Sequence, residues 1–203
     1  STLFELCEAF YAEGGPTRLR LRAETLSGTS EALLSGQADL ALGVSGEIGQ
    51  GDIRVAPLGT LTFVFAVAPH HPLANVSHPL SDEERFVHRA VAVADSTQRG
   101  RGRSHNIAPG QDVLTVPTMQ HKLEAQLRGL GAGFLPRSLA QPFIDAGRLV
   151  VKPVQGPSRD IPLCYAGGQP PDPREQPRAL AWWLARLQHP NTRQALLLQH
   201  HQV

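Results

Sequence analysis

Residues 128–136, RGLGAGFLP, place Gly129, Gly131 and Gly133 two positions apart and end in a proline. A dinucleotide-binding loop needs such glycines after a strand and before a helix, where helix N-terminal amides meet the pyrophosphate. Here residues 119–128 have helical spacing of leucines, and AGFLP (132–136) indicates a strand. The run therefore predicts a helix end, with Gly129 or Gly131 left-handed and Gly133 allowing the strand to pack closely.

The composition is that of an ordinary globular chain. Its 203 residues are 41% hydrophobic and 18% charged, enough for one large or two small cores. A net charge of +1 is too small for the broad basic surface of a nucleic-acid-binding domain. The only cysteines, Cys7 and Cys164, lie in apolar stretches, as expected of buried thiols in a reducing compartment. The sequence contains no membrane-span pattern and no signal-peptide pattern, so we expect a cytoplasmic location.

The first part of the chain alternates helix and strand patterns. An apolar helix over the first residues ends at EGGP (13–16), and RLRLRAE (18–24) has the period of two of a strand. A helix at 28–36 and a buried strand at 38–44 follow. The strand at 38–44 would pair in parallel with the strand at 18–24. Residues 53–59 and 61–69 then predict two strands separated at Gly59.

A second α/β unit begins near Ser81. SDEE (81–84) is a capping box, and strands are predicted at 90–95, 112–118, 132–136, 148–154 and 161–167. Helices are predicted at 119–128, at 137–147 ending in Gly147, at 178–187, and at 191–200 with Asn191 as its cap.

Four segments, in this order and spacing, resemble the effector-binding domain of LysR-type transcriptional regulators. EALLSGQADLALG (31–43) is similar to the family's helix, glycine and buried strand, and FAVAPHHPLA (65–74) to its strand followed by His-Pro-Leu. VPTMQHKLEAQLRGLGAGFLP (116–136) resembles the main helix of the second lobe with its Gly-x-Gly and strand. IDAGRLV (144–150) resembles a later Gly-x-Leu strand entry.

The resemblance implies an α/β fold of the periplasmic-binding-protein type II class, with two Rossmann-like lobes joined by two crossover strands. Lobe I, regulatory subdomain I, would comprise residues 1–66 plus 166–203, and lobe II, regulatory subdomain II, residues 67–165. The family's N-terminal winged helix-turn-helix is absent from this sequence. The resemblance further implies a homodimer or tetramer, and DNA contact only through that missing domain. The first helix and the helix with Leu123 and Leu127 are candidate subunit contacts, although ordinary core packing explains both as well.

The resemblance also implies a small-molecule effector, with no cofactor and no metal. Ligands of such sheets bind beyond the carboxyl ends of strands, near helix N-termini. Hydroxyls and amides at three such places suit a small anion or polar aromatic, with Met119 or Phe134 as an apolar wall. For any single hydroxyl, helix capping explains its position equally well. The predicted effector-binding residues are Thr25, Ser27, Thr29, Asp95, Ser96, Thr97, Thr118, Met119 and Phe134.

Other kinds of site are less well supported by the sequence. His70, His71 and His78 are close in sequence, but neighbouring histidines point apart in an extended chain, which disfavours a metal site. GVSGE (43–47) lacks the last glycine of a hydrolase nucleophile elbow, and the sequence shows no set of catalytic residues. We therefore expect that the protein is not an enzyme. The alternating arginines at 99–103 favour a solvated loop over an effector contact. The alternative function is an exported solute-binding protein of a transport system.

Overall fold

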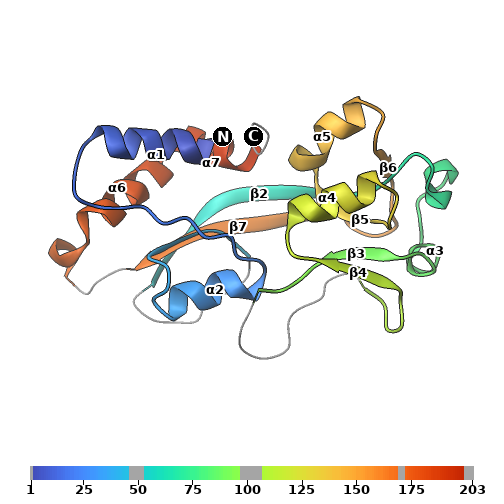
Figure 1. The fold of residues 1–203 in the computed structure, drawn as a ribbon, viewed down its shortest axis with the longest axis horizontal. Helices are drawn as coiled ribbons and strands as arrows, with labels where there is room; N and C mark the ends of the chain where they lie inside the picture. The colour runs from blue at the N-terminus through green and yellow to red at the C-terminus, as the bar shows by residue number, and fades with distance from the viewer. Residues whose placement is uncertain (1, 46–52, 97–106, 169–171, 199–203) are drawn as a thin grey trace. The chain divides into compact units, whose positions relative to one another are not determined.

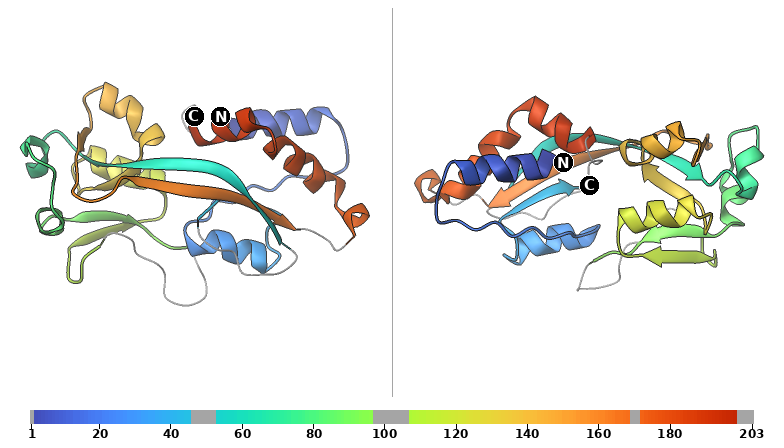
Figure 2. Two further views of the ribbon diagram at one scale, coloured as in Figure 1. Left: turned by 180° about the vertical axis from the view of Figure 1, so that it is seen from behind. Right: turned by 45° about the horizontal axis from the view of Figure 1, so that its top comes forward.

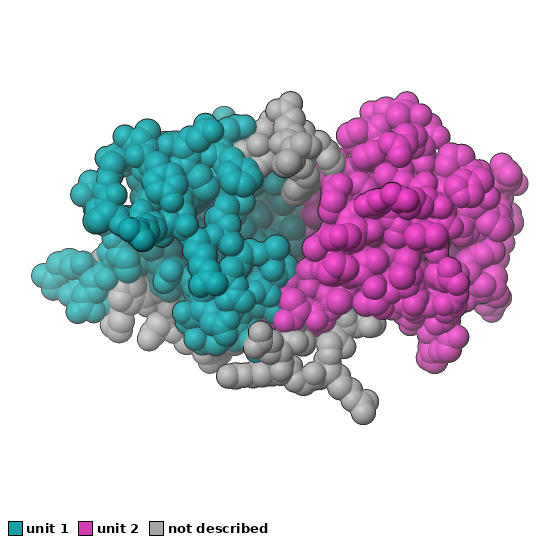
Figure 3. All heavy atoms as spheres, in the orientation of Figure 1, with its two compact units in different colours: residues 1–24, 28–60, 162–203 teal, residues 25–27, 61–161 magenta. Residues whose placement is uncertain are grey.

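A computed structural model describes residues 2–45, 53–96, 107–168 and 172–198. The chain forms two compact units, which Figure 3 shows in different colours. Unit 1 comprises residues 1–24, 28–60 and 162–203, and unit 2 comprises residues 25–27 and 61–161. The expected lobe bounds differ from these by a few residues and remain a prediction.

The larger sheet has the strand order β1-β7-β2-β5, and β6 also pairs with β2 (Figure 1). Its pairs β1–β7, β2–β5 and β2–β6 are antiparallel. Two long strands, β2 and β7, each contain residues of both units. The strands of this sheet are β1 (Leu40–Val44), β2 (Ile53–Val67), β5 (Gly133–Pro136), β6 (Val150–Lys152) and β7 (Arg159–Gly168).

A second, two-stranded sheet lies in unit 2. Its strands β3 (Ala90–Val93) and β4 (Val113–Val116) are parallel, with Ala90 opposite Val113. The helix that follows β4 packs against both strands, as the views in Figure 2 show. The α/β unit predicted for this part of the chain is therefore present, and its two strands are parallel.

The helices occur close to their predicted positions. Three of them, α2, α4 and α5, end in a glycine with φ near +70°, at Gly36, Gly129 and Gly147. In each case the two amides from the glycine onward bond back to carbonyls of the last turn, the Schellman arrangement. The helices are α1 (Thr2–Ala12), α2 (Ser27–Leu34), α3 (Asp82–Phe86), α4 (Met119–Leu127), α5 (Arg137–Asp145), α6 (Arg178–Leu187) and α7 (Pro190–Leu198), with short 3-10 helices η1 (Pro72–Asn75) and η2 (Pro173–Glu175).

Each unit has its own apolar core. In unit 1, Leu58, Tyr165 and Leu187 pack together where α6 and α7 meet the sheet. In unit 2, α4 and α5 cover one face of the sheet through Leu123 and Leu139. A second cluster of unit 2 forms around Phe65, Val67, Leu73, Leu80, Ala132 and Phe134.

The glycine run serves two separate purposes. Gly129 has φ +72° and ends α4, as predicted. A Cβ on Gly131 would lie 2.7 Å from the carbonyl oxygen of Arg89, and one on Gly133 would lie 3.1 Å from the carbonyl oxygen of Val91. Both glycines therefore let the chain approach β3 closely, and Gly131 does so more than the predicted Gly133.

Several local predictions are wrong. Residues 18–24 form no strand, and no described segment pairs with them, so the predicted parallel pair with 38–44 does not exist. The alternation there reflects only an extended, exposed segment, whose Arg22 binds Glu24 and Gln37. Gly59 does not separate two strands but lies inside β2, with φ +148°.

Two side-chain predictions also need correction. Helix α7 begins at Pro190, so Asn191 lies inside the helix and does not precede it as a cap. Leu123 is 1% exposed, and Leu127 packs against the same core, so this side of α4 faces the interior and not a partner subunit. Ordinary core packing, the alternative to a subunit contact, therefore explains both leucines.

Candidate functional site

Two polar segments about 70 residues apart in sequence meet in unit 2, beyond the end of β3. The Thr25 amide donates to Ser96 Oγ at 2.8 Å, and Thr25 Oγ1 donates to the Ala94 carbonyl at 2.5 Å. The Ser27 amide and hydroxyl donate to the two oxygens of Asp95, at 3.0 and 2.7 Å. We call Thr25, Ser27, Asp95 and Ser96 the hydroxyl cluster.

The backbone between the two hydroxyls is strained. Leu26 has φ +51°, and it is the only described non-glycine residue with positive φ. A left-handed leucine costs on the order of 1–3 kcal/mol, and such residues persist where their surroundings hold them in place. Here the hydrogen bonds of Thr25 and Ser27 hold Leu26 from both sides.

The cluster is arranged as a preorganised set of donors and acceptors. Asp95 accepts a hydrogen bond from the amide of Ser27, the first residue of α2, and the helix dipole favours a carboxylate at this position. The hydroxyls of Thr25 and Ser27 already donate within the protein, so what they still offer a ligand is oxygen lone pairs. All four residues are partly exposed.

The structure gives Thr118, Met119, Phe134 and Thr29 other surroundings. Thr118 caps α4, because its hydroxyl accepts from the His121 amide at 3.2 Å. Met119 packs against the core under α4, and Phe134 is 6% exposed with its ring 5.2 Å from that of Phe65. Thr29 is half-buried in α2 and belongs to unit 1. Thr97 and the arginines at 99–103 lie outside the described residues.

The histidines of the His-Pro segment have structural roles. His71 is 7% exposed, its Nδ1 accepts from the Leu73 amide at 3.1 Å, and it caps η1. Burial lowers the pKa of His71, and nearby His88 and His70 lower it further. His78 instead contacts Glu84 at 2.7 Å. Among the described residues, no three His, Cys, Asp or Glu side chains are grouped to hold a metal ion.

Comparison with known proteins decides the family. The family model for the LysR substrate binding domain matches residues 1–190. The chain belongs to the LysR substrate-binding domain family. Its mixed α/β fold is accordingly of the periplasmic-binding-protein type II class, as the sequence predicted.

Among curated relatives of this LysR domain, the uncharacterized HTH-type transcriptional regulator YeeY of Escherichia coli K12 is 38% identical over 186 residues. That match covers 90% of the chain and 58% of the relative, so the chain spans little more than half of the longer protein. The regulatory domain of MetR from N. meningitidis superposes with a TM-score of 0.70 at 18% identity, covering 97% of the chain and 89% of that regulatory domain. Full-length LysG from Corynebacterium glutamicum, with bound effector Arg, gives 0.67 at 21% identity, covering 95% and 64%.

Two features of the cluster in this LysR domain were missed by sequence reasoning. The left-handed Leu26 has no sequence signal, since leucine is a poor choice for that conformation. The Ala94 carbonyl could not be found either, because backbone groups carry no residue identity. Separately, none of the helices in the described ranges is long and apolar enough to cross a membrane.

Proposed function

We propose that this LysR domain binds a small polar effector at the hydroxyl cluster. The observation that carries the proposal is the strained Leu26 held between two hydrogen-bonded hydroxyl residues. Strain of this kind is typical of ligand sites, where a preorganised arrangement is worth its cost. The bound effector Arg of LysG supports a small-molecule ligand for this fold.

The contacts of the cluster define what the effector needs. We keep the predicted class, a small anion or polar aromatic, and add that it carries a hydrogen-bond donor for Asp95 or for the hydroxyl oxygens. Asp95 already occupies the Ser27 amide, so an anionic group at this helix end would have to compete with it. Thr118 and Met119 at the start of α4, and the other predicted residues, remain candidates for the rest of the ligand.

The effector would act by shifting an equilibrium between conformations. It must bind one arrangement more tightly than another, since equal affinity shifts nothing. In the full-length protein we propose that this shift controls DNA binding in a cytoplasmic homodimer or tetramer, and that no reaction is catalysed. The names of relatives as transcriptional regulators support this over a transport protein. Phe4 and Tyr11 of α1, each 54% exposed, are the apolar surface we propose for a subunit contact.

A thermal-shift screen followed by calorimetry tests the site. The probes are L-arginine, benzoate and hydroxybenzoates, titrated into wild type and into Thr25→Val, Ser27→Ala and Thr118→Val. The matched control is Ser158→Ala, because Ser158 Oγ also donates to a carboxylate, Asp160, at 2.7 Å on an exposed surface.

We expect a probe that binds wild type to lose at least about tenfold in affinity in Ser27→Ala, roughly one hydrogen bond to a charged group. Ser158→Ala should bind as wild type does. Unchanged affinity in both Thr25→Val and Ser27→Ala would show that the effector binds elsewhere.

A further inference from the structure

A small pocket lies inside unit 2. None of the residues that line it belongs to the hydroxyl cluster. Residues of α3, α4, β2, β3 and β5 line it, and it is open to solvent on one side. The walls combine aromatic rings with cationic groups. The residues that matter for its chemistry are Phe65, Arg85, Phe86, Lys122, Gly133 and Phe134.

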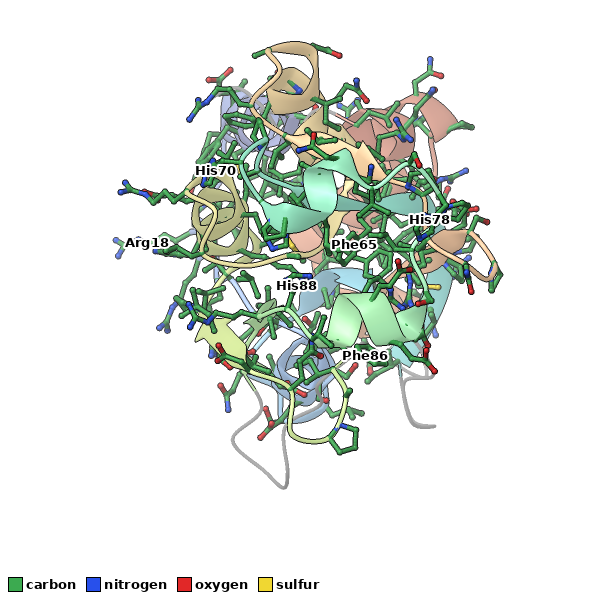
Figure 4. The ribbon with its side chains drawn as sticks, turned by 90° about the vertical axis from the view of Figure 1, so that its right-hand side faces the viewer. Arg18, Phe65, His70, His78, Phe86 and His88 are labelled. Carbon is green, nitrogen blue, oxygen red and sulfur yellow. The ribbon has the colours of Figure 1, made fainter. Side chains whose placement is uncertain are left out.

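Arg85 is the buried cation of this pocket. It is 6% exposed, and its guanidinium lies 5.3–5.6 Å from the ring centres of Phe65, Phe86 and Phe134. Figure 4 views unit 2 from the side on which Phe65 and Phe86 are labelled. One amino group of Arg85 pairs with Asp82, but its buried Nε has no hydrogen-bond partner in the described structure. A buried N–H donor without an acceptor costs about 1–3 kcal/mol, so it is a strong candidate to meet a ligand.

Lys122 is a second cation at the same pocket. Among the described residues, none accepts a hydrogen bond from the Lys122 ammonium. Burial lowers the pKa of Lys122 to about 8. The Lys122 side chain packs directly over Gly133, since a Cβ there would lie only 3.1 Å from Lys122 Cε and 3.2 Å from Nζ.

The surrounding charges leave a positive balance. Asp82 pairs with Arg85, and Asp112 pairs with the rim residue Arg89 at 2.7 Å. Arg159 adds another cation, 3.9 Å above the Phe134 ring and close enough to Arg85 for each to repel the other. Among the described groups, Lys122 is thus left without a matching carboxylate.

We propose that this pocket binds a small carboxylate. One carboxylate oxygen would accept from the Lys122 ammonium, and the other from the Arg85 Nε–H once that buried side chain turns toward the pocket. The apolar carbon would lie against the phenylalanine rings. A carboxylate suits the pocket because it supplies both missing acceptors with one negative charge, and charge-assisted hydrogen bonds are the strong ones. The site is distinct from the proposed effector site, so either can exist without the other.

The test is an NMR titration of the chain with sodium acetate, followed through the backbone amides of Gly133 and Phe134. Acetamide, which has the same shape without the charge, and sodium chloride, which has the charge without the shape, are the comparison probes. The variants are Lys122→Met, which keeps the length of the side chain, and Gly133→Ala, which keeps both cations and displaces the Lys122 side chain from its place over β5. The control is Arg128→Met, an exposed cation on the cap of the same helix.

We expect saturable acetate shifts at Gly133 and Phe134, at least tenfold weaker binding in Lys122→Met and Gly133→Ala, and none of this with acetamide. Arg128→Met, and Ser27→Ala in the hydroxyl cluster, should bind acetate as wild type does. Equal shifts with chloride, equal shifts with acetamide, or unchanged acetate affinity in Lys122→Met would each overturn the proposal. Melting curves of each variant confirm that it is folded before it is titrated.

Discussion

Replacing Gly131 with alanine should separate β5 from β3. A Cβ at this position would lie 2.7 Å from the Arg89 carbonyl oxygen and 2.9 Å from Val91 Cγ2. The neighbouring residue Ala132 links the two segments, because its amide donates to Arg89 at 2.9 Å and its carbonyl accepts from Val91 at 2.9 Å. The obstacle is backbone, so relief of the clash must lengthen these two hydrogen bonds.

The expected cost follows from the geometry. Overpacking of a tight site costs about 1–3 kcal/mol, and an obstacle of backbone places Gly131→Ala toward the upper end of that range. Gly147→Ala is the matched comparison, with φ +68° and nothing within 4 Å of the new Cβ. It carries only left-handed strain of about 1–2 kcal/mol, offset by about 0.4–1 kcal/mol from the stiffer unfolded chain. Taking about 2–3 kcal/mol for Gly131→Ala and roughly 2–4 °C per kcal/mol, its Tm should fall by about 4–12 °C, and Gly147→Ala should lower Tm by less than half of that.

Differential scanning calorimetry measures both variants. Trp182 and Trp183 are the only tryptophans and both lie in unit 1, so tryptophan fluorescence supplies a reference transition outside the mutated unit. The larger shift should appear in the calorimetric transition of unit 2. If Gly131→Ala melts no lower than Gly147→Ala, the close approach of β5 to β3 is not tight enough to constrain this glycine.

Three further predictions concern unit 2. The free energy of unfolding of wild type should rise between pH 8 and 10.5, on the order of 1–3 kcal/mol, because the unfolded chain keeps the proton that folded Lys122 has lost; urea titrations of Lys122→Met should lack this rise. Ser81→Ala should cost about 1 kcal/mol in thermal unfolding, since it removes the capping box that Ser81 forms with Glu84; a loss below the error of the measurement would contradict the role of the cap. Gln126→Met should cost about 1–3 kcal/mol in urea, because two buried carbonyls lose their donor, and an unchanged midpoint would contradict this.

The elements that were predicted correctly are those whose signals are local. The capping box at Ser81 and the glycine ends of α4 and α5 depend on neighbouring residues alone, so the sequence was sufficient to place them. Residues 18–24 failed because alternation states only that a segment could form a strand, and a strand also needs a partner. Gly59 failed as a break because its backbone conformation fits within β2, where a Cβ would meet Leu197 at 2.3 Å.

The candidate site divides in the same way. Thr25, Ser27, Asp95 and Ser96 were predicted because each follows a strand pattern, but the strand expected before Thr25 does not form. Their bonds to one another depend on a fold that brings distant segments together. Arg85 was missed for a related reason. In sequence it is one charge in a polar helix start, and only the three phenylalanine rings around it show that it is buried.

The buried Gln126 side chain has a consequence for how unit 2 reaches its native pairing. Its Nε2 donates to the carbonyls of Ala66 on β2 and Gly133 on β5, at 2.7 and 3.0 Å, and these two residues face each other across the strands. A slip of one residue between β2 and β5 would move one carbonyl out of reach and would also turn the apolar residues of β5 to the wrong face. The Gln126 amide thus depends on the alignment of both strands at once. A misaligned intermediate would contain an unpaired buried donor and would be less stable than the native pairing.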